Sequence, residues 1–134
     1  MATVQVRYIV NDVDAAIAFY TTHLGFHLDM HPAPIFAMLS RGDLRLVLSA
    51  PIGPNTGGGS VLPDGTTPEP GGWNRFAVEV QDVSETVERL RRAGVHFRSG
   101  IIEGVGGRQA LVEDPSGNLI ELFQPVAPEA RLGS

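Results

Sequence analysis

Arginine and glutamate occupy alternating positions in several short apolar segments, as expected when charged side chains share one face of a sheet. Arg7, Arg45 and Arg75 could present guanidinium groups to a carboxylate or a phenolate. Glu79 and Glu121 are the candidate general bases. The chain contains no cysteine, which excludes thiolate nucleophiles and cysteine-based zinc sites. The residue types therefore favour anion recognition or acid–base chemistry.

The elements that must position these residues occur twice along the chain. Residues 6–13 read Val-Arg-Tyr-Ile-Val-Asn-Asp-Val, and residues 75–83 read Arg-Phe-Ala-Val-Glu-Val-Gln-Asp-Val. Either Asn11 or Asp12 is the predicted N-cap of the first helix and Asp82 that of the second, because each precedes an apolar stripe at helical spacing. Each half is predicted to be β-α-β-β-β, and one copy cannot bury its sheet face alone. The two copies are therefore expected to pack or pair, with a ligand cleft lined by both sheets.

The remaining strands are predicted from period-2 patterns and turn signals. In the first half they cover 26–31, 35–40 and 44–49, and Pro32 and Pro34 are expected to break the first two. In the second half they cover 95–99, 107–113 and 119–124. The segment Asp114-Pro115-Ser116-Gly117-Asn118 predicts a tight turn before the last strand.

The length of 134 residues predicts a single domain over residues 1–125. Its parts are module one at 3–50, a loop at 51–72, module two at 73–125 and a tail at 126–134. Twelve of the 22 loop residues are Gly or Pro. Such a segment is either a plain connector or a lid over the cleft.

The net charge of the chain excludes some classes of binding partner. A net charge of −5 and a pI of about 5.2 argue against binding to nucleic acid or an anionic membrane, because both require a basic face. The chain shows no signal-peptide pattern and no apolar run of about 20 residues. We therefore expect a cytoplasmic protein.

Four sequence motifs resemble those of a known family. Asn11-Asp12-Val13, Ala18-Phe19-Tyr20, Leu24-Gly25-Phe26 and above all residues 114–122 (Asp-Pro-Ser-Gly-Asn-Leu-Ile-Glu-Leu) resemble the vicinal oxygen chelate superfamily. This group includes glyoxalase I, bleomycin-resistance proteins, fosfomycin-resistance enzymes and extradiol dioxygenases. The resemblance covers roughly residues 4–125. It implies an α+β fold in which tandem βαβββ modules form a cupped, barrel-like mixed sheet with helices outside.

The resemblance also implies where a metal would bind. The four ligand positions of the metal-dependent members correspond to Gln5, Val47, Arg75 and Glu121. Val47 has no donor atom, and Arg75 is cationic and cannot act as a ligand. We therefore expect no metal and no other cofactor, and a salt bridge between Arg75 and Glu121 that is either structural or functional. The alternative is a divalent metal (Ni, Mn, Zn or Fe) held by further ligands.

The predicted function is binding or sequestration of a small molecule, as in bleomycin-resistance proteins, by a homodimer. One alternative is a metal-dependent glyoxalase-type lyase, an isomerase or a dioxygenase. The other is a metal-free enzyme in which Glu121 and Glu79 are the catalytic residues and arginine stabilises an oxyanion. The predicted ligand-binding residues are Gln5, Arg7, Arg45, Val47, Trp73, Arg75 and Phe123.

Overall fold

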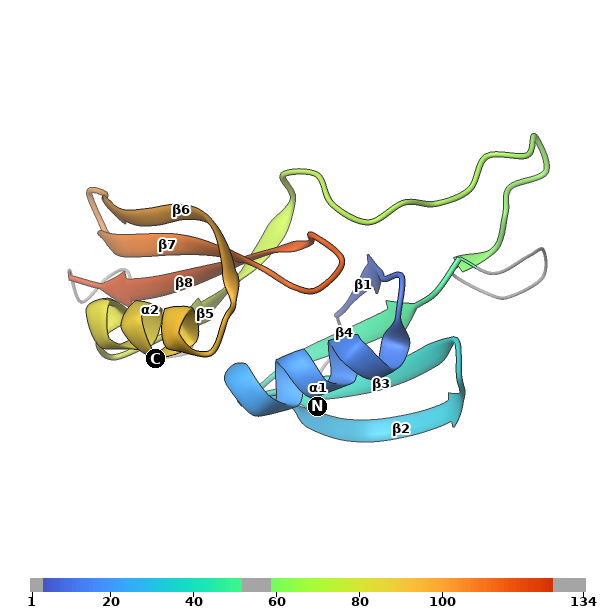
Figure 1. Cartoon of the computed structure of the whole chain (residues 1–134), viewed down its shortest axis with the longest axis horizontal. Coiled ribbons are helices and arrows are strands. Elements are labelled where there is room, and N and C mark those ends of the chain that lie inside the picture. Colours follow the sequence, from blue (N-terminus) through green and yellow to red (C-terminus); the bar gives the residue numbers. More distant parts are fainter. Residues whose placement is uncertain (1–3, 52–58, 127–134) are drawn as a thin grey trace. The chain divides into compact units, whose positions relative to one another are not determined.

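The structure, a computed structural model, describes residues 4–51 and 59–126. Part of the predicted loop (52–58) and most of the predicted tail (127–134) lie outside the described residues. The chain divides into two compact units (Figure 1). Unit 1 comprises Met1–Gly71 together with Pro115–Asn118, and unit 2 comprises Gly72–Asp114 together with Leu119–Ser134. In the described part of the chain, no helix is both long and apolar enough to cross a membrane.

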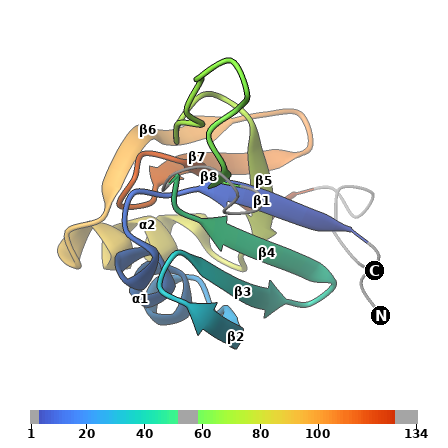
Figure 2. The same ribbon diagram turned by 90° about the vertical axis from the view of Figure 1, so that its right-hand side faces the viewer.

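Unit 1 contains a four-stranded mixed sheet and one helix. Its elements are β1 (Gln5–Ile9), α1 (Val13–His23), β2 (His27–Ala33), β3 (Phe36–Arg41) and β4 (Leu44–Ser49). The strand order is β1-β4-β3-β2. Strand β1 is parallel to β4, and the other pairs are antiparallel. Helix α1 packs against one face of this sheet (Figure 2), so the opposite face carries the predicted site residues of this unit.

Unit 2 has the same order of elements. They are β5 (Arg75–Glu79), α2 (Val83–Arg92), β6 (His96–Glu103), β7 (Gly107–Glu113) and β8 (Leu119–Pro125). The strand order is β5-β8-β7-β6, with β5 parallel to β8. The α+β fold and the tandem βαβββ order of elements are therefore as predicted. The strands form two four-stranded mixed sheets, one in each unit, instead of the one barrel-like sheet that the family resemblance implies.

Both helices begin where the sequence predicts. The Asp12 carboxylate accepts a hydrogen bond from the Ala15 amide at 3.0 Å, and the Asp82 carboxylate accepts one from the Glu85 amide at 3.1 Å. Each satisfies a backbone donor that the first helical turn leaves open. The core lies between each helix and its sheet. Its fully buried side chains include Tyr20, Leu39, Leu46, Leu48, Leu90, Ile120 and Leu122.

Two strand boundaries differ from the prediction. Strand β2 continues through Pro32 to Ala33, although Pro32 was expected to break it. Strand β2 lies at the edge of its sheet, where a residue without an amide donor is tolerated, and its pairing with β3 shifts register between Met30 and Ala33. Strand β6, also at an edge, continues to Glu103 instead of ending near residue 99. Two register shifts allow its longer path.

The turn at residues 115–118 belongs to unit 1 and is held there by hydrogen bonds. Asn118 Nδ2 donates to the Ile9 carbonyl at 2.9 Å, and Asn118 Oδ1 accepts from the Gly71 amide at 2.8 Å. The Asn11 amide donates to Ser116 Oγ at 2.8 Å. The Asn118 residue is only 4% exposed. Its side-chain amide therefore satisfies backbone groups at the end of β1 and in the segment before β5.

Candidate functional site

The predicted salt bridge is present on the face of the unit 2 sheet opposite α2. Arg75 Nε lies 2.9 Å from Glu121 Oε1, and the two side chains are 29% and 19% exposed. The geometry follows from the strands, because Ala77 on β5 is in register with Glu121 on β8. Arg75 lies two residues from Ala77, on the same face. Helix α2 covers the other face, to which Val78 and Leu122 point.

Gln109 on β7 joins this pair. When its amide nitrogen faces the carboxylate, as the hydrogen-bond pattern requires, it donates to Glu121 Oε1 at 2.9 Å and to Oε2 at 3.2 Å. The Glu121 carboxylate is therefore bonded to a guanidinium and an amide. We call Arg75, Gln109 and Glu121 the arginine cluster. The sequence reasoning missed Gln109, although its alternate position on strand 107–113 would have placed it on this face.

A second group forms around Trp73, just before β5. The Arg98 guanidinium lies over the Trp73 ring, with Cζ 4.8 Å from the ring centroid. Arg98 Nε lies 2.8 Å from Glu113 Oε2, and Nη1 donates to the Gly72 carbonyl at 2.6 Å. Trp73 remains 68% exposed. Arg98 therefore holds an exposed indole in place, a role that nothing in the sequence indicated.

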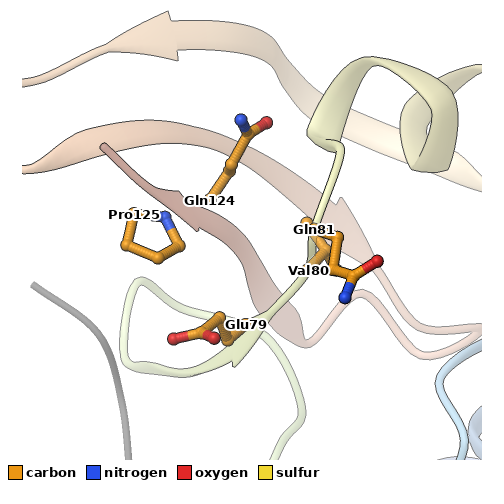
Figure 3. Close-up of a pocket in the computed structure, with 5 residues that line it drawn as sticks. All are labelled: Glu79, Val80, Gln81, Gln124 and Pro125. Carbon is orange, nitrogen blue, oxygen red and sulfur yellow. The ribbon is translucent and has the colours of Figure 1, made fainter. Parts of the chain in front are cut away.

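Glu79 and Phe123 lie further along the same two strands, where they are in register. Both are half-buried. Glu79 also lines a hollow of about 280 Å³ at the end of β5 (Figure 3). The two candidate bases therefore share one sheet face but have different surroundings: Glu121 belongs to the arginine cluster, whereas Glu79 lies beside the hollow.

The other predicted residues lie on the face of the unit 1 sheet opposite α1. Gln5 is in register with Arg45, and Arg7 with Val47. Val47 is buried, whereas Gln5 and Arg7 are exposed. Arg45 Nη1 lies 3.6 Å from the sulfur of Met38 on β3. This face of unit 1 thus combines two guanidinium groups with an apolar floor.

At the edge of the same sheet, Asp29 is held by two side chains. His27 Nδ1 lies 2.9 Å from Asp29 Oδ1, and Ser40 Oγ donates to the same oxygen at 3.1 Å. The hydrogen bond with His27, followed by that from Ser40, holds the pKa of the Asp29 carboxyl below its ordinary value, and the charge of Arg45 acts in the same direction.

The residues at the implied metal positions do not fit a divalent cation. Unit 1 offers the Gln5 amide and the aliphatic Val47, and unit 2 offers a cation and a carboxylate already bonded to it. A guanidinium cannot coordinate a metal and repels one. Within residues 4–51 and 59–126, no three His, Cys, Asp or Glu side chains are grouped so as to hold a metal ion.

Comparison with known proteins gives a family and a set of similar structures. The family model described as Glyoxalase/Bleomycin resistance protein/Dioxygenase superfamily matches residues 3–122. TnmS3, an antibiotic-binding protein from Streptomyces sp. CB03234, is 28% identical, with a TM-score of 0.66 over 90% of this chain and 93% of that one. A superfamily member from Sphaerobacter thermophilus is 26% identical, with a TM-score of 0.71 over 92% and 98%.

One curated relative is similar over a shorter segment. Lactoylglutathione lyase from Arabidopsis thaliana is 42% identical over 55 residues, which are 40% of this chain and 19% of that protein. The match therefore spans about a fifth of the relative's length.

Proposed function

Because the chain belongs to the glyoxalase/bleomycin resistance protein/dioxygenase superfamily, we propose that it binds a small molecule without a divalent metal and without converting it. The arginine cluster carries this proposal. In it, the positive charge of Arg75 lies 2.9 Å from the carboxylate that the family resemblance assigns to a metal. Gln109 occupies further acceptor positions of the same carboxylate. A cation entering here would have to displace an ion pair and an amide.

The chemistry of this sheet face suggests the kind of ligand. Trp73 offers an exposed ring, and Phe123 adds apolar surface. Arg75 carries further N–H groups, which suit a carbonyl or phenolate oxygen. A planar, oxygen-bearing aromatic compound combines both features. The 28% identity to an antibiotic-binding protein over most of both chains supports binding of a small molecule.

The fluorescence of Trp73, the only tryptophan in the chain, tests the proposal. Chelator-treated protein is titrated with a panel of planar aromatic antibiotics, and the ligand is analysed afterwards by mass spectrometry. We expect saturable quenching at one site per chain and unchanged ligand. Trp73→Leu should weaken binding measured by calorimetry, whereas Glu88→Gln on the exposed face of α2 should not.

Calorimetric titration with nickel, manganese and zinc tests whether the protein binds a divalent metal. Micromolar binding at one site per chain would contradict a metal-independent site, as would ligand binding that requires a divalent cation. Light scattering of the same samples tests the expected homodimer, whose mass is twice the 14.3 kDa of one chain.

A second candidate is a glyoxalase-type lyase, favoured by the 42% identity over 55 residues to lactoylglutathione lyase. Under this reading Glu79 or Glu121 is the base. Incubation of glutathione with a 2-oxoaldehyde, with and without added divalent cations, should then form the 2-hydroxyacyl thioester, and Glu121→Gln should slow that reaction. No thioester above the level of a protein-free control under any of these conditions would exclude this activity.

A further inference from the structure

Trp73 offers a ligand one face of its ring, because the other face is already covered. The Arg98 guanidinium lies over the indole, with Cζ 4.8 Å from the ring centroid. In the described part of the chain, no other ring or cation stacks on Trp73. The residue stays 68% exposed, although tryptophan is highly buried on average. The planar ligand proposed above would therefore stack on the ring face opposite Arg98.

Two further contacts hold the guanidinium above the ring. Its Nε atom lies 2.8 Å from Glu113 Oε2, and its Nη1 atom donates to the Gly72 carbonyl at 2.6 Å. The Arg98 and Glu113 side chains are only 23% and 28% exposed. Glu113 is the last residue of β7, so a strand holds the carboxylate that orients the guanidinium. The positive charge therefore has a defined position relative to the indole.

A fixed cation changes which rings the uncovered face of Trp73 prefers. The face of an aromatic ring carries partial negative charge and repels an electron-rich ring stacked on it. A guanidinium within about 6 Å of the centroid attracts that electron density from the other side. A ligand stacked about 3.5–4.0 Å from the indole would lie about 8–9 Å from the guanidinium carbon, within the Debye length of about 10 Å at about 0.1 M salt. The attraction therefore reaches the ligand, although the Glu113 carboxylate offsets part of it.

We propose that Arg98 makes the Trp73 site selective for electron-rich rings, above all for aromatic ligands ionised at a phenol group. This selectivity rests on the aromatic site proposed above and adds the ionisation state of its ligand. The net charge of −5 disfavours anions over the surface in general, so a preference for a phenolate requires a local source. Arg98 is that source behind the indole, whereas Arg75 can bond the phenolate oxygen itself.

The test compares two planar probes of nearly the same shape, 4-nitrophenolate and 4-nitroanisole, at a pH where the phenol is fully ionised. Both are titrated into 15N-labelled protein, and the indole N–H signal of Trp73, the only tryptophan, reports binding. We expect the original protein to bind the phenolate more tightly. Arg98→Gln should reduce the ratio of the two affinities at least about threefold. Arg108→Gln removes the same charge five residues from Glu113 along β7, about 17 Å away, and should leave the ratio unchanged.

Arg98→Lys is the second variant, because Arg98→Gln leaves the Glu113 carboxylate without its ion pair. Lysine keeps a positive charge, so Arg98→Lys should retain more of the phenolate preference than Arg98→Gln does. If Arg98 only holds the indole in place, Arg98→Gln should weaken both probes equally. An unchanged affinity ratio in Arg98→Gln would therefore overturn the proposal.

The original protein supplies two further outcomes against the proposal. Equal affinities for the two probes, or tighter binding of 4-nitroanisole, would overturn the selectivity while the aromatic site itself stands. No shift of the indole signal with either probe would overturn the selectivity and argue against stacking on Trp73. The antibiotic titration then shows separately whether the proposed function fails as well.

Discussion

The Arg75–Glu121 pair should be coupled more strongly than an ordinary surface ion pair. Exposed pairs couple by about 0.2–1 kcal/mol, whereas removal of one partner from a fully buried pair costs about 3–5 kcal/mol. With side chains 29% and 19% exposed, this pair lies between these limits. We expect a coupling energy of about 1–2 kcal/mol, since water still screens part of the interaction.

A double-mutant cycle measures this coupling. Arg75→Met, Glu121→Gln and the double variant are unfolded in urea, and the free energies of unfolding are compared. Unit 2 supplies a matched control in Arg108 and Glu103, whose Nε and Oε1 atoms lie 3.0 Å apart but whose side chains are 31% and 74% exposed. The same cycle on that pair should give less than about 0.5 kcal/mol.

The reasoning is refuted if the two cycles give the same coupling energy. Burial would then add nothing to the coupling energy of the Arg75–Glu121 pair. The pair at the implied metal positions would be no stronger than an ordinary surface ion pair. Far-UV circular dichroism and Trp73 fluorescence should report coincident transitions, which two-state fitting requires. Fluorescence follows unit 2, since Trp73 lies there.

Three further predictions concern other contacts. Asn118→Ala should lower the free energy of unfolding by about 2–3 kcal/mol, because it leaves the Gly71 amide and the Ile9 carbonyl without the hydrogen bonds that the buried side chain makes to them. Ser116→Ala should lower it by about 1 kcal/mol, and equal effects of the two substitutions in urea unfolding would contradict the larger contribution of Asn118. Arg98→Lys keeps the charge but loses the planar guanidinium over Trp73, so acrylamide should quench the indole more efficiently; unchanged quenching would argue against the stacking. The Asp29 carboxyl has a lowered pKa, so the stability that its charged form adds to the protein is complete above the ordinary value of about 3.9 and is lost as pH falls through the lower folded value. Asp29→Asn should therefore flatten the pH dependence of the urea midpoint below about pH 4. The same pH dependence in the variant and the original protein would refute this.

The features that follow from local rules could be predicted from the sequence. Asp12 and Asp82 cap their helices because short side-chain oxygens satisfy the first-turn amides, a rule that needs no tertiary information. The contact between Arg75 and Glu121 followed from the resemblance, which placed both at metal positions. Alternation along strands put both on one face.

Features that depend on register or on distant pairing could not be predicted. Gln109 reaches Glu121 because β7 and β8 are antiparallel with Leu111 opposite Glu121, and the turn signal alone does not fix that register. Arg98 contacts Trp73 because the backbone at Gly72 places the indole beside it. That segment has no strand or helix periodicity from which its path could be predicted. Pro32 stays within β2 because that strand is at an edge, which composition does not reveal.

Cutting the chain between Gly71 and Gly72 would not give two self-sufficient fragments. The first fragment would end before residues 115–118, the four residues that complete unit 1. It would lose the Asn118 and Ser116 groups that satisfy Ile9 and Asn11. A split-protein reporter built on this break would therefore depend on the second fragment for those hydrogen bonds. The first fragment should then fold poorly by itself, and the reporter should give a signal only when the two fragments reassemble.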